Sequence, residues 1–287
     1  MRDLRDDDRS EYFQRKLDQP FIAALRQIDG TTPAPRGDPL SARQRILATA
    51  SHVGGTPVVG GIAASILYGN PWFDPDFRIE LLRAPSASNK QSDGKTAHRY
   101  MLARNDVIEL EGVLVTTPVR TAFDIGRVTP EWRGLGNLDA LSRATAFSIP
   151  DLARYVDTHG GWRYIRQLRT LVPLIDGRAE SPRESALRLL IIRGELPIPE
   201  LQIVVADEAG TEFARIDMGY PDQKIGIEYD GEEFHSREWQ RKRDAHRDKL
   251  LTELGWNMIH VDADRMRDSP TGILVEIESA LHDRRHY

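Results

Sequence analysis

The carboxy-terminal third of the chain alternates between helix-like and strand-like segments, and this order constrains the fold more than any other feature of the sequence. A helix over SPRESALRLLIIRG begins at Ser181, with a proline at its first position. Three short runs follow, LQIVVAD, TEFARIDMGY and KIGIEYDG, and the turn sequences DEAG and PDQ between them predict hairpins. A long amphipathic helix ending at Gly255, a fourth strand and a closing helix complete the order α-β-β-β-α-β-α. We therefore expect a mixed α/β domain here.

A different order precedes this domain. The segment SARQRILATA predicts a helix capped by Ser41, and a second helix is expected over Gly61 to Tyr68. Helix, helix, strand, strand is the order of a winged helix, and PVRTAFDIGR then begins another helix with Pro118 in its first turn. The strand-like runs lie near Phe77, His98 and Val107.

The length of 287 residues corresponds to about two domains. We divide the chain into an N-terminal helix and linker (1–40, the helix near Pro20 to Ile28), a winged-helix-like module (41–130), a helical connector (131–176) and the α/β domain (177–287). The connector shows three helical patterns, and the polar, punctuated stretch DGRAESPRES marks the boundary after it.

The chain has no cysteine, which excludes disulfides, cysteine nucleophiles and thiolate zinc sites, and fits a reducing cytoplasm. The charged amino terminus does not resemble a signal peptide. The uncharged run from Val53 to Phe73 contains five glycines and two prolines, so we expect a buried helix with turns instead of a membrane span. The sequence thus predicts a cytoplasmic protein without a membrane partner.

The net charge of −5 is unevenly distributed, because residues 180–287 carry 15 Lys and Arg against 23 Asp and Glu. DNA-binding proteins usually show a basic excess, which lowers the expectation of DNA binding. A site whose own carboxylates are neutralised by cations remains compatible with this charge.

Acidic residues gather near the ends of the predicted strands. Glu228 and Asp230 are two apart on the third strand and so share one face, and Asp217 lies on the neighbouring hairpin strand. Carboxylates placed together repel one another unless they are solvated, protonated or bridged by a cation. With Glu184 on the preceding helix as a fourth candidate, these oxygens predict a Mg²⁺ or Mn²⁺ site.

Basic residues follow the acids. His235 comes after the Gly231 turn and is a candidate for proton transfer, while Arg243 and Arg247 are four apart on one helix face and could contact phosphate. Each residue alone also has a simpler interpretation: a hairpin aspartate, a turn-initiating acidic pair, a structural histidine, a solvated helix face. Their joint placement favours a catalytic site.

The stretch from Ser181 to Asp262 resembles the PD-(D/E)xK nuclease superfamily, and within it the family related to the very-short-patch repair endonuclease. The matching segments are ESPRESALR, RIDMGYPDQKIGIEYDGEEFH and RDAHRDKLLTELGW. The resemblance implies an α-β-β-β-α-β core and magnesium-dependent hydrolysis of DNA phosphodiester bonds. It implies that Glu184 is the first-helix acid, Asp217 the metal-binding aspartate, Glu228 the second acid and His235 the proton-transfer residue.

One position departs from this pattern. The superfamily usually has lysine two residues after the second acid, where this chain has Asp230. An aspartate can add a metal ligand but cannot stabilise the attacked phosphate. Either His235, an arginine or Lys242 takes over that role, or activity is lost.

Residues from about Thr56 to Arg127 resemble the antitoxin-like winged-helix module that accompanies this nuclease-like domain in actinobacterial proteins. The matching segments are GGIAASILYG, VIELEGVLVTTP and PVRTAFDIGR, although the helix lacks the serine, histidine and arginine often found at its start. Contact of this module with DNA or with a protein partner is the corresponding expectation.

The main hypothesis is a metal-dependent DNA endonuclease, in which Asp217, Glu228 and Asp230 bind Mg²⁺ or Mn²⁺. The phosphate-contacting candidates are Lys242, Arg243 and Arg247. The first alternative is a catalytically degenerate nuclease fold that acts as a DNA-binding regulator or as an antitoxin-like component of a toxin–antitoxin or defence system. A protein-interaction scaffold is the second alternative.

Overall fold

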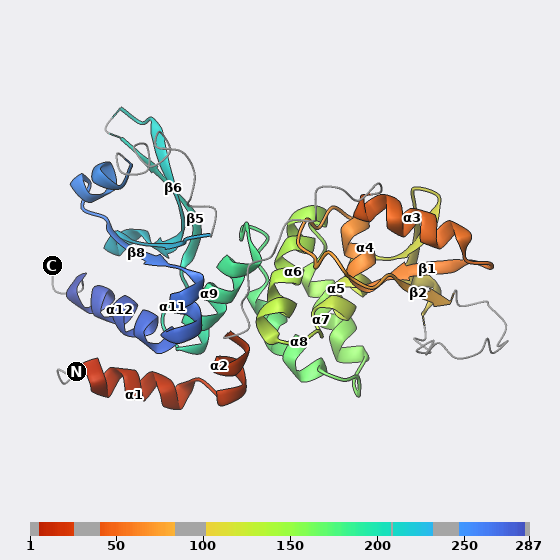
Figure 1. Ribbon diagram of the computed structural model, residues 1–287, viewed down its shortest axis with the longest axis horizontal. Helices are drawn as coiled ribbons and strands as arrows, with labels where there is room; N and C mark the ends of the chain where they lie inside the picture. Colours follow the sequence, from red (N-terminus) through yellow and green to blue (C-terminus); the bar gives the residue numbers. More distant parts are fainter. Residues whose placement is uncertain (1–5, 26–40, 84–101, 208, 232–246, 285–287) are drawn as a thin grey trace. The chain divides into compact units, whose positions relative to one another are not determined.

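The structure is a computed structural model that describes residues 6–25, 41–83, 102–207, 209–231 and 247–284 (Figure 1). Contacts between residues divide the chain into two units, and each is described by itself. Unit 1 combines residues 1–30 with 178–287, and unit 2 contains residues 31–177. Both units contain helices and a four-stranded sheet, so the predicted mixed α/β class is confirmed.

Unit 1 is built on a sheet with the strand order β5-β6-β7-β8. The first three strands are antiparallel neighbours, whereas β8 pairs parallel to β7. A helix precedes β5 and helical residues 247–253 precede β8, which confirms the predicted α-β-β-β-α-β order in the described residues. The elements are α9 (Pro182–Arg193), β5 (Glu200–Ala206), β6 (Glu212–Tyr220), β7 (Ile225–Tyr229) and β8 (Asn257–Val261).

The core of unit 1 is formed by buried residues of helix α9, strand β7 and the helical segment 247–253. Strand β7 is buried from Ile225 to Glu228, and α9 is buried from Glu184 to Ile191, as expected of a helix inside a core. Leu251 of the helical segment 247–253 packs with Ile203 and Ile216 of the sheet. Strands β6 and β7 approach so closely that a Cβ at Gly219 would lie 2.1 Å from the carbonyl oxygen of Ile225.

The amino-terminal helices belong to unit 1. Helix α1 (Asp6–Lys16) packs against α12 (Pro270–Asp283), and α2 (Gln19–Leu25) contacts α11 (Ala263–Asp268) (Figure 1). Phe13 is fully buried, the Arg9 Nη1 donates to Ser279 Oγ at 2.6 Å, and Lys16 forms an ion pair with Glu195. The sequence predicted a helix only near residues 20–28; it missed α1, because few apolar residues mark its buried side.

Unit 2 contains a second sheet, with the strand order β2-β1-β4-β3. Strand β1 pairs parallel to β4 and antiparallel to β2, and β3 and β4 form a hairpin. The two expected helices are present and precede that hairpin. The elements are α3 (Ala42–His52), β1 (Pro57–Gly60), α4 (Gly61–Leu67), β2 (Glu80–Arg83), β3 (Val107–Leu110) and β4 (Val113–Thr116).

Two details of unit 2 differ from the expectation. Strand β1 was not predicted, because its four residues lie in the uncharged run from Val53 to Phe73, for which the sequence predicts a buried helix with turns. The run VIELEGVLVTTP was read as one strand, whereas it turns back at Glu111 and Gly112, both of which have positive φ. The expected strand near His98 lies outside the described residues. None of the described helices is long and apolar enough to cross a membrane.

Helices complete unit 2. Helix α5 (Pro118–Ile125) begins with Thr117 as its cap and packs against α4, α6 (Glu131–Thr145) and α7 (Ile149–Thr158). Helix α8 (Ile165–Leu171) contacts α6 and α7. The three helical patterns expected for residues 131–176 are therefore present, and they share one contact unit with the sheet.

Candidate metal centre at the end of strand β7

Three side chains that can ligate a metal converge at the ends of β7 and β8. One ligand atom from each of Glu228, Asp230 and His260 lies within 4.8 Å of the other two. The parallel pairing explains this convergence, because Glu228 and His260 are register partners on adjacent strands. Asp230 follows directly, and its backbone N–H donates to the carbonyl oxygen of Val261 at 2.8 Å. The main chain is thus held where these side chains emerge.

His260 is the member of this group that no sequence motif predicts. Its Nδ1 lies 3.4 Å from each carboxylate oxygen of Asp230 and 4.0 Å from Glu228 Oε2. The hydrogen bond to Asp230 raises the pKa of His260 above its usual value. The signal in the sequence was a polar residue between Ile259 and Val261 in a strand, but its significance depends on the pairing of β8 with β7.

Asp217 is oriented by the backbone of β7. The last described β6–β7 pair at this end is Met218 with Ile227, and beyond it the backbone N–H of Tyr229 donates to Asp217 Oδ2 at 2.9 Å. The carboxylate therefore takes the place of a main-chain acceptor where the ladder ends. Burial raises the pKa of Asp217, although the Tyr229 N–H favours the charged form. Asp217 is not within the 4.8 Å group of described residues.

Glu228 is the most buried acid of the cluster, at 7% exposure. Its Oε2 accepts from Arg247 Nη2 at 2.7 Å, and the same guanidinium contacts Asp248 Oδ1 at 3.1 Å. Burial raises the pKa of Glu228, and the charge of Arg247 opposes this shift. Of the four basic residues proposed from the sequence, Arg247 is described and lies at the acids, whereas His235, Lys242 and Arg243 lie outside the described residues.

Glu184, on α9, lies near enough to Asp217 for their charges to interact. Its Oε2 accepts from the backbone N–H of Glu180 at 2.8 Å and from Gln202 Nε2 at 3.1 Å. Burial raises its pKa to about 7, and the negative charge of Asp217 adds to this effect. Glu184 therefore holds a proton at lower cost than an ordinary glutamate near neutral pH.

The donor set fits a divalent cation. Two carboxylates and one imidazole within 4.8 Å supply oxygen and nitrogen ligands, and buried acids with raised pKa values gain from a nearby positive charge. Arg247 supplies part of that charge through its ion pair with Glu228. Asp248 offers the guanidinium a second partner, so Arg247 is not restricted to Glu228.

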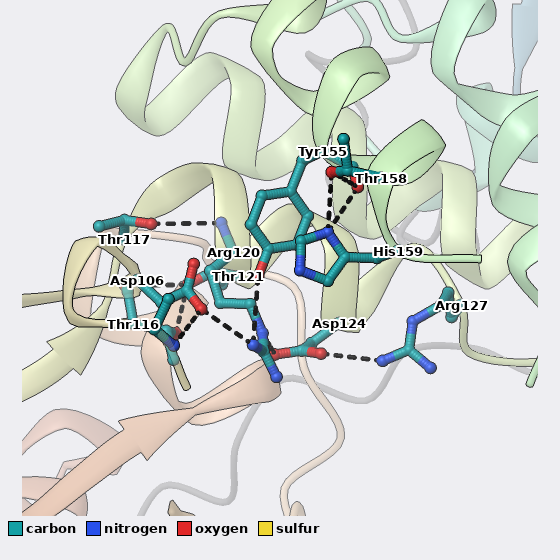
Figure 2. A network of polar contacts seen from close by, with 11 residues as sticks. Asp106, Thr116, Thr117, Arg120, Thr121, Asp124, Arg127, Tyr155, Thr158 and His159 are labelled. Atoms are coloured by element: carbon teal, nitrogen blue, oxygen red, sulfur yellow. Dashed lines mark hydrogen bonds and ion pairs between the residues drawn. The ribbon is translucent and has the colours of Figure 1, made fainter. Parts of the chain in front are cut away.

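Unit 2 contains a second polar cluster, which involves the motif TTPVRT (Figure 2). The fully buried guanidinium of Arg120 contacts Asp124 through Nε at 2.8 Å and Asp106 through Nη1 at 3.3 Å. The same Nη1 donates to the hydroxyl of Tyr155 at 3.2 Å. Arg120 thereby connects helix α5 with α7 and with the start of β3.

The threonines of this motif serve the helix terminus. Thr117 Oγ1 accepts from the backbone N–H of Arg120 at 3.3 Å, and the hydroxyls of Thr116 and Thr121 lie 2.7 Å apart (Figure 2). Tyr155 stacks on His159 at a centroid distance of 3.9 Å. Thr116, Thr117, Arg120 and Thr121 of this motif thus have structural roles at the start of α5.

Comparisons with known proteins agree with this architecture. The restriction-endonuclease-like family model REase_MTES_1575 matches residues 198–281, and the model of the AbiEi antitoxin C-terminal domain matches residues 63–174. The resemblance of both parts that the sequence indicated is confirmed. No solved structure matches the chain significantly.

Two curated relatives match most of the chain. They are the uncharacterized proteins MT2308 and Rv2248 of Mycobacterium tuberculosis, from strains CDC 1551 / Oshkosh and ATCC 25618 / H37Rv respectively. Each is 32% identical over 242 residues, which cover 84% of this chain and 87% of the relative. The chain belongs to the family of these two mycobacterial proteins.

Proposed function

We propose that this protein is a metal-dependent DNA endonuclease whose catalytic site lies at the end of β7. The observation that carries the proposal is the convergence of Glu228, Asp230 and His260 within 4.8 Å, beside Asp217, in a restriction-endonuclease-like domain. DNA is the proposed substrate, and the cytoplasm is the expected location of a cysteine-free chain of this kind.

Asp217, Glu228 and Asp230 are the proposed ligands of Mg²⁺ or Mn²⁺. Such a cation, when bound, lowers the pKa of a bound water and offsets negative charge on the attacked phosphate. The protein prepares the site by burying Glu228 and by fixing Asp217 through the Tyr229 N–H, so that the acids are oriented before binding.

Arg247 is the proposed substitute for the lysine that the superfamily pattern would place at Asp230. Its half-buried guanidinium already lies at the acids, 2.7 Å from Glu228, and a guanidinium can form two hydrogen bonds to one phosphate. Glu184 is proposed to orient a water beside Asp217. The roles of His235 in proton transfer and of Lys242 and Arg243 in phosphate contact remain predictions for residues outside the described part.

Plasmid nicking by the full chain tests this function. We expect conversion of supercoiled to open-circular DNA with Mn²⁺ or Mg²⁺, and its loss in Asp217→Asn, because the neutral amide weakens cation binding. Asp222→Asn is the matched control, because this substitution makes the same chemical change at an exposed position in the β6–β7 turn. The proposal fails if wild type and Asp217→Asn nick equally, or if neither nicks in Mn²⁺.

A second candidate is a nuclease fold without cleavage that acts as a DNA-binding regulator or as an antitoxin-like component of a defence system. Asp230 at the lysine position and the match of residues 63–174 to an antitoxin domain favour it. This candidate predicts salt-dependent DNA binding in the presence of EDTA, with equal affinity in wild type and Asp217→Asn. A protein partner of unit 2 would then be sought by co-purification with the chain.

The division of the sequence at residues 40, 130 and 176 also remains a proposal. Contacts group the structure differently at the amino terminus, because α1 and α2 associate with unit 1. Limited proteolysis of the full chain, with the fragments identified by mass, would locate the accessible boundaries.

A further inference from the structure

We infer that His260 is itself a ligand of the catalytic cation, which makes the site a mixed nitrogen–oxygen centre that prefers Mn²⁺ to Mg²⁺. This inference rests on the proposed function, because it concerns the same site. It goes further by adding a ligand and by naming the class of cation, a first-row transition metal, that the site selects.

The distances around His260 agree with ligation of one ion. Metal–ligand bonds of about 2.1 Å place two ligand atoms of the same ion roughly 3 to 4.2 Å apart. The Nδ1 of His260 lies 3.4 Å from the oxygens of Asp230 and 4.0 Å from Glu228 Oε2, which are inside this range. The hydrogen bond to Asp230 is longer than the usual limit of about 3.2 Å, and Glu228 Oε2 lies beyond hydrogen-bond distance of the imidazole.

The position of His260 on a paired strand favours a fixed ligand. Strand β8 is in register with β7 from Ile225 with Asn257 to Tyr229 with Val261, so His260 and Glu228 emerge side by side. Arg265 donates to the carbonyl oxygen of His260 and further fixes its backbone. Ligands that are held by rigid elements lose little freedom when a cation binds.

The chemistry of imidazole then predicts the metal preference. Mg²⁺ favours oxygen ligands and retains several waters, whereas imidazole nitrogen suits first-row transition metals. An imidazole in the ligand set therefore makes the site less suited to Mg²⁺ than to Mn²⁺. The carboxylates of Asp217, Glu228 and Asp230 supply the hard oxygen donors that Mn²⁺ also needs.

Pulsed electron paramagnetic resonance of Mn²⁺ bound to the full chain tests the inference directly. A bound imidazole gives a ¹⁴N modulation of the Mn²⁺ echo, which we expect in wild type and not in His260→Gln. Calorimetry should show that His260→Gln lowers Mn²⁺ affinity by about tenfold or more, the loss typical even of residues that only support a ligand, while Mg²⁺ affinity changes less.

Two histidine variants serve as controls. His235→Gln removes the imidazole predicted for proton transfer, and His282→Gln removes one from α12, so both should keep the ¹⁴N modulation. Retained Mg²⁺ binding in His260→Gln shows that the variant is folded. This control separates loss of a ligand from loss of the fold.

The outcomes separate the inference from the proposed function. If Mn²⁺ binds to wild type in an Asp217-dependent way but without ¹⁴N modulation, His260 is not a ligand and the endonuclease proposal stands. The inference also fails if the modulation disappears in His235→Gln and persists in His260→Gln. If neither Mn²⁺ nor Mg²⁺ binds to wild type, both proposals fail.

Discussion

The buried guanidinium of Arg120 offers the sharpest test of how unit 2 is stabilised. We consider Arg120→Met, which keeps an unbranched apolar stem in the same space and removes the charge. Arg120 has no exposed surface, and the side chains of its partners Asp106 and Asp124 are 6% and 10% exposed. Two carboxylates would therefore lose their shared cation in a region with little water.

The expected magnitude follows from these contacts. Removing one member of a buried ion pair typically destabilises a protein by about 3–5 kcal/mol. Asp124 would keep Arg127 at 2.8 Å, and Asp106 would keep the N–H of Ala103 at 2.8 Å. Because both acids retain one partner, we expect a loss of about 3 kcal/mol in the free energy of unfolding of unit 2.

Hydrogen exchange measured by mass spectrometry in increasing urea resolves the two units. Peptides from α5 and α7 should lose protection in Arg120→Met, while peptides from β6 and β7 stay unchanged. Arg154→Met is the matched control, because the ion pair of Arg154 with Asp151 is largely exposed and should contribute less than about 1 kcal/mol.

A double variant tests the cause. Adding Asp106→Asn to Arg120→Met removes one of the stranded charges, so part of the lost stability should return. The reasoning is refuted if Arg120→Met lowers the free energy of unfolding no more than Arg154→Met does. It is also refuted if Asp106→Asn lowers the stability of the Arg120→Met variant further.

Three further predictions concern unit 1. The pKa of Glu184 is raised from the usual 4.5 to about 7. Its protonation therefore stabilises the fold fully below pH 4.5, and this stabilisation is lost as the pH rises through 7. In urea unfolding with EDTA, the free energy of unfolding of Glu184→Gln should therefore rise relative to that of wild type by up to about 3 kcal/mol between pH 4.5 and 8.5. A difference between the two proteins that does not change with pH contradicts this. Phe13→Ala should destabilise unit 1 by about 3–5 kcal/mol, and the neighbouring, 45% exposed Tyr12→Ala much less, as thermal unfolding would show. Gly219→Ala should lower the melting temperature through contact with the Ile225 carbonyl, and an unchanged value would show that β6 and β7 can separate.

The order of elements in unit 1 could be predicted because local signals were consistent. Apolar runs of strand length, the turn sequences DEAG and PDQ, and the proline after Ser181 all mark boundaries that depend on neighbouring residues only. The acid within β6 and the acids at the end of β7 were visible for the same reason. Helix α1 was missed, since its packing partner α12 supplies most of the reason for it to be helical.

His260 shows why part of the candidate site could not be predicted. Its significance depends on parallel pairing between β7 and β8, which joins residues about thirty positions apart and leaves no local signal. Arg120 is a similar case, because a fully buried arginine is rare and only Asp124 is a local partner, four residues along α5. Its other partners, Asp106 and Tyr155, come from distant parts of the chain. Side chains whose roles arise from tertiary contacts are the ones that the sequence alone left open.

The association of α1 with α12 has a consequence for how this protein is made. Arg9 and Ser279 contact each other across 270 positions of the chain. At a synthesis rate of about 5–20 residues per second, α1 leaves the ribosome roughly 15 to 50 s before the partner on which it packs. Residues 31–177 are complete well within that interval. Unit 1 is therefore completed last, after the whole of unit 2 has been translated.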